Sequence, residues 1–161
     1  MQNSQIILLK RLAKADKHYL ALKEYKTLIR VLEKETDLYN EATFSTLQAA
    51  QRAILDAYLK RFSSLQDFLG AKVFPLLLEV SGLGSTKMSE VLFAMEKEQI
   101  IDSFENWIEL REVRNDLEHD YPDDLEDALK ELKFCVDSFD RLESYYLNSR
   151  QFAKRFVDAV I

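Results

Sequence analysis

The sequence predicts an all-α protein, built as an up-and-down antiparallel bundle of four to six helices. Apolar residues recur at three- and four-residue steps along most of the 161 residues, which is the spacing of one helix face. Only three Gly and two Pro interrupt the chain, and the tight-turn pairs typical of β-hairpins are missing. So few helix-breaking residues favour a few long helices with short connections, as in antiparallel bundles.

Length and composition indicate one globular domain over residues 1–161. Hydrophobic residues make up 47% and charged residues 31% of the chain, as in folded proteins. Cys135 is the only cysteine, so an intrachain disulfide is impossible, which fits a reducing compartment. No apolar run reaches the ~20 residues of a membrane-spanning helix, and the run near the N-terminus is too short for a signal peptide. We therefore expect a cytoplasmic protein with no membrane partner.

The formal net charge of −6 excludes a uniformly basic surface, so DNA is not an expected partner. Nucleic acid could still bind a small local basic patch, with an affinity that falls as salt rises. An acidic surface also suits a basic protein partner.

Residues 5–37 predict the first helix, with apolar residues mostly at three- and four-residue steps. A run of more than 30 residues favours a break near residues 15–18. His18 is interpreted as an exposed surface histidine, because helix surfaces are mostly polar.

A second long helix follows the polar residues 40–43, which can cap it, and runs to about Leu69. Gly70 suits the position just past a helix end, where a left-handed backbone is common. Arg61 falls near the apolar stripe of this helix. It is either a surface arginine whose stem covers apolar surface or a basic group held near the core, and the first is more common.

The remaining helices are shorter. Residues 73–80 predict one with Pro75 in its first turn, where the missing N–H costs nothing. A loop over residues 81–87 follows, with Ser85 or Thr86 as the next cap. Further helices are expected over residues 88–98 and over residues 104–120, the second with Asp102 or Ser103 as its cap. The last helix is expected to begin at Asp123, with Glu126 completing a capping box. An amphipathic segment over residues 145–161 follows it. Cys135 is interpreted as a packing residue.

The densest polar group lies just before Pro122, where Arg114, Asn115, His119 and Tyr121 fall within eight residues. At about 100° per residue, Arg114 and Tyr121 share one helix face, and Asn115 and His119 share another. Arg114 and His119 lie about 140° apart on a regular helix. They converge only if the helix loosens or if a second copy of the chain contributes. Pro122 disfavours the α conformation at Tyr121, so the helix should end near residues 119–121.

These residue types suit cleavage of RNA without metal or cofactor. His119 can take the proton of a ribose 2′-hydroxyl near neutral pH, and a helix C-terminus favours its protonated form. Arg114 offers a planar fork for the charge that develops on the phosphate. Asn115 can orient His119 or the phosphate, and Tyr121 can stack on a base or offer its hydroxyl.

A structural interpretation fits the same residues. Arg111 and Asn115 are an ordinary pair four residues apart on a solvated helix face, and Arg114 can pair in the same way with the acid four residues after it. His119 can cap the helix C-terminus, and Tyr121 can lie at the edge of the core. Charged helix ends are common, so residue chemistry alone favours this interpretation.

The stretch Arg114-Asn-Asp-Leu-Glu-His119-Asp-Tyr121 fits the R-x4-H-x-Y motif, and the chain thereby resembles the HEPN superfamily. At average residue usage, a chain of this length matches the motif by chance about once in two hundred. Asn115 directly follows the arginine, and the motif lies near a helix end, late in an all-α chain of suitable size. The chain is similar to the stand-alone members that pair with minimal nucleotidyltransferases, called HepT toxins or nucleotidyltransferase substrate-binding proteins. The likeness covers residues 45–148 as a core bundle and leaves residues 1–40 as an N-terminal helical extension.

This resemblance implies a homodimeric ribonuclease toxin whose two motif copies face each other across a cleft. Arg114 of one chain would serve beside His119 of the other, supported by Asn115, Tyr121 and Arg111. It also implies a nucleotidyltransferase antitoxin that transfers AMP to Tyr121 and silences the site. A non-catalytic substrate-binding subunit of that nucleotidyltransferase is the alternative, and a helical interaction module without an active site is the third hypothesis.

Acidic residues crowd the motif at Asp116, Glu118, Asp120, Asp123 and Asp124. Their charge would repel the phosphates of RNA and would suit docking of a basic partner.

Overall fold

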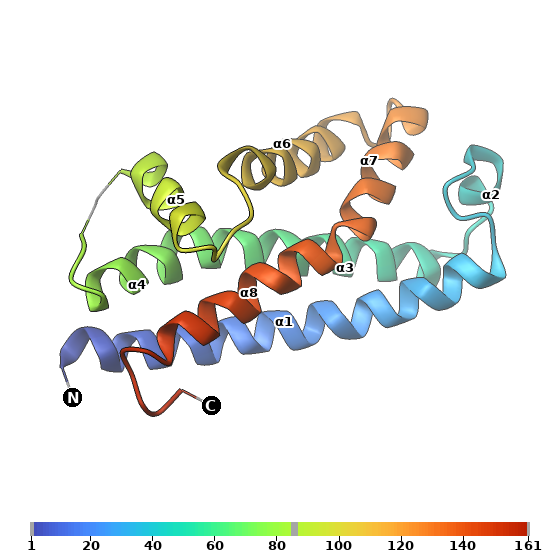
Figure 1. Cartoon of the computed structure of the whole chain (residues 1–161). Coiled ribbons are helices and arrows are strands. Elements are labelled where there is room, and N and C mark those ends of the chain that lie inside the picture. The colour runs from blue at the N-terminus through green and yellow to red at the C-terminus, as the bar shows by residue number, and fades with distance from the viewer. Residues whose placement is uncertain (1, 85–86, 161) are drawn as a thin grey trace.

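The computed structural model describes residues 2–84 and 87–160, and this part of the chain contains helices but no strand. The elements are α1 (Asn3–Glu35), α2 (Glu41–Ser45), α3 (Ala49–Phe68), the π-helix η1 (Leu69–Val73), α4 (Phe74–Val80), α5 (Met88–Lys97), α6 (Phe104–Asp120), α7 (Leu125–Asp137) and α8 (Phe139–Ala153). The predicted all-α bundle is confirmed (Figure 1). If the continuous α3–η1–α4 rod is counted once and the short α2 is left out, the described residues form six main helices.

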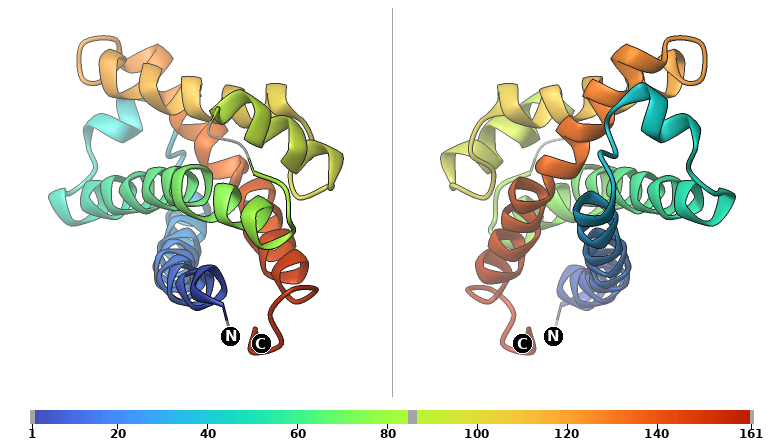
Figure 2. Two further views of the ribbon diagram at one scale, coloured as in Figure 1. Left: turned by 90° about the vertical axis from the view of Figure 1, so that its left-hand side faces the viewer. Right: turned by 90° about the vertical axis from the view of Figure 1, so that its right-hand side faces the viewer.

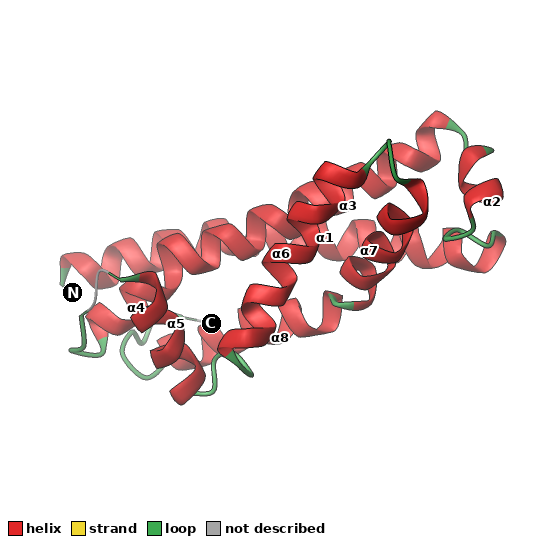
Figure 3. Ribbon diagram, turned by 90° about the horizontal axis from the view of Figure 1, so that it is seen from above, coloured by secondary structure: helices red, strands yellow, loops and turns green. Residues whose placement is uncertain are grey.

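The long helices α1 and α3 lie side by side in opposite directions, and α8 packs beside α1 (Figures 1 and 3). α6 and α7 pack against each other on the far side of α3 from α1 (Figure 2). One hydrophobic core joins them, and its fully buried side chains include Leu8, Leu22, Ile29, Tyr58, Phe62, Phe74 and Leu77. α1 therefore shares the core with α3. The division into residues 1–40 and 45–148 stays a prediction.

The predicted break in the first helix is wrong, because α1 runs without interruption from Asn3 to Glu35. Ala15, at the expected break, is fully buried, and alanine is the strongest helix former. Buried residues recur along the whole length of α1, and their packing against the core stabilises it as one unbroken helix. His18 is not the exposed histidine that was expected: it is partly buried, with its ring 5.8 Å from that of Phe68 on α3.

Gly70 does not end the second long helix, as the sequence had indicated. It is buried inside η1, and the chain continues into α4, where Pro75 occupies the first turn as predicted. A Cβ atom at Gly70 would lie 2.9 Å from Cζ2 of Trp107, which is closer than two carbon atoms can approach. The glycine is required for this contact with α6 and not for a left-handed turn.

The C-terminal third differs from the prediction in two places. The cap of α7 is Asp124 and not Asp123: its Oδ1 accepts a hydrogen bond from the backbone N–H of Asp127 at 3.3 Å. The helix then breaks at Ser138, earlier than expected, because α7 packs on α6 whereas α8 turns to pack on α1 and α4. Cys135 is a buried packing residue as predicted, and burial raises the pKa of its thiol to about 12.

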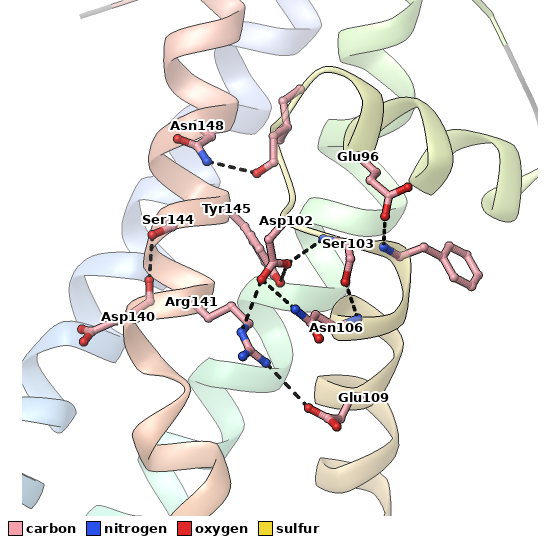
Figure 4. A network of polar contacts seen from close by, with 12 residues as sticks. Glu96, Asp102, Ser103, Asn106, Glu109, Asp140, Arg141, Ser144, Tyr145 and Asn148 are labelled. Carbon is pink, nitrogen blue, oxygen red and sulfur yellow. Dashed lines mark hydrogen bonds and ion pairs between the residues drawn. The ribbon is translucent and has the colours of Figure 1, made fainter.

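A polar network ties the start of α6 to α8 (Figure 4). Asp102, just before α6, accepts hydrogen bonds from the Tyr145 hydroxyl and from the Asn106 side chain (2.9 Å). Arg141 lies 3.7 Å from the same carboxylate. Ser103, one of the two predicted caps, accepts the Asn106 amide at 3.0 Å. These contacts hold the start of α6, whose other end carries the motif.

No helix in residues 2–84 and 87–160 is long and apolar enough to cross a membrane. Ser85 and Thr86, the predicted caps of α5, lie outside the described residues.

Candidate functional site

The motif occupies the last turns of α6. The helix stays regular to Asp120, and Tyr121 follows it in an extended conformation with φ −84° and ψ 132°. The helix end predicted from Pro122 is therefore confirmed. Because α6 does not loosen before this point, the motif side chains leave the helix at their regular angles.

Arg114 points into the protein, and its side chain is only 7% exposed. Its Nη1 donates a hydrogen bond to the Ser63 carbonyl at 2.8 Å, and its Nη2 forms an ion pair with the Asp67 carboxylate. Both partners belong to α3. The Nε of Arg114 is buried and has no hydrogen-bond partner among the described residues. The guanidinium thus ties α6 to α3 and keeps one donor unused.

A pocket of about 420 Å³ lies beside Arg114, between α2, α3, α6 and α7. This volume falls within the roughly 300–1,000 Å³ usual for ligand sites. Tyr121 lines it and is 44% exposed, with its ring edge-on to Phe44 at 6.2 Å. The apolar walls come from Leu55, Leu59, Leu117, Leu129 and Leu132, and the charged residues carry both signs (Arg52, Lys60, Arg114, Asp56, Asp67 and Glu118). The structure therefore brings Arg114 and Tyr121, which the spacing placed on one helix face, to one pocket.

His119, Asn115 and Arg111 are exposed and follow one another at four-residue steps along α6. None of them lines the pocket that holds Arg114. On a regular helix, Arg114 and His119 leave the axis about 140° apart. Within one chain, the two predicted catalytic side chains are not brought together, and their meeting requires a second copy.

Sequence reasoning missed Asp67 and Ser63, the partners of Arg114. The predicted local pair with Glu118 is not formed in the part of the chain that the structure describes, and Asp67 takes its place. Asp67 precedes Arg114 by 47 residues, so no short-range spacing could reveal the pair. Only the packing of α6 on α3 does so.

Carboxylates gather at the end of α6, and α7 adds Glu131 to those that the sequence indicated. Glu131 is partly buried, and its Oε2 is inaccessible to water. This burial, followed by the neighbouring Asp120, raises the pKa of Glu131 to about 7. Asp116 and Asp127 act in the same direction. Burial and neighbouring negative charge both disfavour the ionised form of a carboxyl group, so Glu131 holds its proton to a higher pH than an ordinary glutamate.

Replacing Glu131 by Gln is expected to stabilise the protein at pH 8 by about 1 kcal/mol and to change little at pH 5. The folded state holds a proton on Glu131 up to about pH 7, whereas the unfolded state releases it at the ordinary, lower pKa. The free energy of unfolding therefore falls as pH rises from the ordinary pKa of a glutamate to the raised pKa of Glu131, about 7. Urea unfolding at both pH values measures the difference.

The control for this experiment is Asp120→Asn. It removes the main charged neighbour of Glu131, so Glu131→Gln should then give a smaller gain at pH 8. An equal gain at pH 5 and pH 8 would contradict the raised pKa of Glu131.

Comparison of the chain with protein-family models, with curated proteins and with solved structures found no match.

Proposed function

We propose that the protein is a HEPN-type ribonuclease toxin that cleaves RNA without metal, at a site shared by two copies of the chain. The observation that carries the proposal is the R-x4-H-x-Y motif at the end of α6, with Arg114 and Tyr121 on one pocket and His119 exposed on another face of the same helix. A nucleotidyltransferase antitoxin is the proposed partner.

The roles follow from the chemistry of each group. His119 takes the proton of the ribose 2′-hydroxyl, the 2′-oxygen attacks phosphorus, and the bond to the 5′-oxygen breaks. A cyclic phosphate forms, and water returns a proton to the leaving oxygen. Arg114 stabilises the charge on the phosphate oxygens. Its partner Asp67 is 64% exposed, and Arg114 and Asp67 both line the pocket, so a phosphate in the pocket can compete for the guanidinium.

Wild-type protein is expected to cleave single-stranded RNA in EDTA, and His119→Ala is expected to lower the rate by about 100-fold or more. Arg114→Ala should cause a similar loss, because the charge on the phosphate is then unopposed. Gel analysis of a labelled oligonucleotide gives the rates, and circular dichroism checks the fold. Glu105→Ala, an exposed change at the opposite end of α6, is the control and should retain full activity. Cleavage that EDTA abolishes would rule out the proposed chemistry.

A non-catalytic subunit that presents Tyr121 to a nucleotidyltransferase is the second candidate. It is favoured by the ion pair that already neutralises Arg114 and by the separation of Arg114 from His119 within one chain. Absence of cleavage in the experiment above, with the fold intact, would select it.

In both candidates, Tyr121 is the proposed acceptor of AMP, since it is exposed at the pocket rim. Its oxygen would attack the α-phosphate of ATP, pyrophosphate would leave, and the phenolic proton would pass to solvent. Incubation with the partner enzyme and ATP should add the mass of one AMP, and Tyr121→Phe should add none. Addition that persists in Tyr121→Phe would assign the acceptor to another residue.

A further inference from the structure

α1 carries a charge opposite to that of the rest of the chain. It contains eight Lys or Arg and four Asp or Glu, a net charge of +4. The whole chain carries −6, so the residues outside α1 carry −10. α1 is therefore a helix of net positive charge in a chain whose other residues are acidic in sum.

Part of the positive charge of α1 lies where this helix packs on α3 and η1. We call Arg11, Lys14, His18, Arg61 and Lys72 the basic patch. Arg11 donates a hydrogen bond from Nη1 to the Lys72 carbonyl at 2.8 Å, which brings two cationic residues together. The Nζ of Lys14 lies 5.3 Å from the ring centre of Phe68, which packs on His18. The three elements α1, α3 and η1 thus contribute to the basic patch.

No ion pair neutralises the basic patch within residues 2–84 and 87–160. The pKa of the His18 imidazole is lowered, first by burial and then by the positive charges of Arg61 and Lys14. Its Nδ1 is buried without a hydrogen-bond partner in the same residues. Cations without carboxylate partners attract polyanions, because counterions are released on binding.

α3 separates the basic patch from the pocket of Arg114. Lys60 and Asp67 line the pocket, while Arg61 and Phe68 follow them by one residue, about 100° further around the helix. Arg61, the member of the patch on α3, is thus within about one helix width, roughly 10 Å, of the pocket. This distance is short enough for a single strand of RNA to contact both.

We propose that the basic patch binds the sugar–phosphate backbone of single-stranded RNA. The choice of RNA rests on the proposed function, and the patch supplies the attraction that the acidic end of α6 lacks. Its four Lys and Arg residues predict that log K falls with log salt at a slope of roughly −3. Binding is independent of base sequence, because phosphates carry no sequence information.

The test is fluorescence anisotropy with a labelled 12-nucleotide RNA, in EDTA, using full-length His119→Ala protein so that the RNA stays intact. Adding Lys14→Gln and Arg61→Gln is expected to weaken binding about tenfold and to reduce the salt slope to roughly −1.5. The control adds Arg30→Gln and Lys34→Gln, which remove the same charge from exposed positions on the opposite side of α1. It should change affinity less than about twofold. Thermal unfolding verifies that both proteins are folded.

Equal weakening in the two sets of variants would overturn the proposal, because total charge and not the patch would then govern binding. Binding to phosphatidylserine vesicles without binding to RNA would also overturn it. If wild-type protein does not cleave RNA but patch-dependent binding persists, the proposed function fails and the basic patch stands. If wild-type protein cleaves RNA but the Lys14→Gln, Arg61→Gln protein binds RNA normally, the role of the basic patch is overturned and the proposed function stands.

Discussion

Mixing Arg114→Ala protein with His119→Ala protein is expected to restore the RNA cleavage that each variant lacks. If Arg114 of one chain acts beside His119 of the other, a mixed dimer holds one site with both groups and one site with neither. Equal amounts that exchange subunits freely give about half mixed dimers, and thus about a quarter of the wild-type rate.

The geometry of α6 is the reason for this expectation. Arg114 is buried against α3, His119 is exposed, and the helix between them is regular. A single chain therefore offers no shared site for the two groups. The control is a mixture of His119→Ala protein with the double variant that lacks both groups, which should stay inactive. Native mass spectrometry verifies that subunits have exchanged. An inactive first mixture despite exchange would eliminate the shared site.

Gly70→Val is expected to destabilise the protein by about 3 kcal/mol. A Cβ atom at this position would lie 2.9 Å from Trp107, and Trp107 cannot retreat easily because it packs on Phe74 at 5.0 Å and on Tyr145 at 5.7 Å. For a chain of this size, the loss lowers the melting temperature by roughly 6–12 °C. Urea and thermal unfolding measure both quantities.

Gly84→Val is the matched control, because a Cβ atom there meets nothing within 4 Å. It should leave the melting temperature nearly unchanged. A second check is the Trp107→Phe background, where the smaller ring leaves room and Gly70→Val should cost less. A full loss in that background would show that the contact with Trp107 is not the cause.

Several features followed directly from local sequence rules. Pro122 predicted where α6 ends, Pro75 predicted the start of α4, and Ser103 was one of two expected caps. Each of these depends on atoms within a few residues along the chain. The helical class depends on the apolar period, which is also a local property. The predicted cap of α7 was wrong by one residue, because Asp123 and Asp124 are adjacent and have the same side chain.

The candidate site was predictable only in part. The spacing of Arg114 and Tyr121 placed them on one helix face, and both line the pocket. The same spacing separated Arg114 from His119, and the structure keeps them apart within one chain. Their catalytic roles, the dimer and the RNA substrate stay predictions.

By itself, the sequence determined the helical class, the end of α6 and the helix angles between Arg114, Asn115 and His119, because backbone geometry and caps act over a few residues. Only the tertiary structure decided that Asp67 neutralises Arg114, that Gly70 allows the close approach of Trp107, and that cations of α1, α3 and η1 form the basic patch. These contacts join residues 37 to 61 positions apart, where no local rule operates and where the packing of helices alone selects the neighbours.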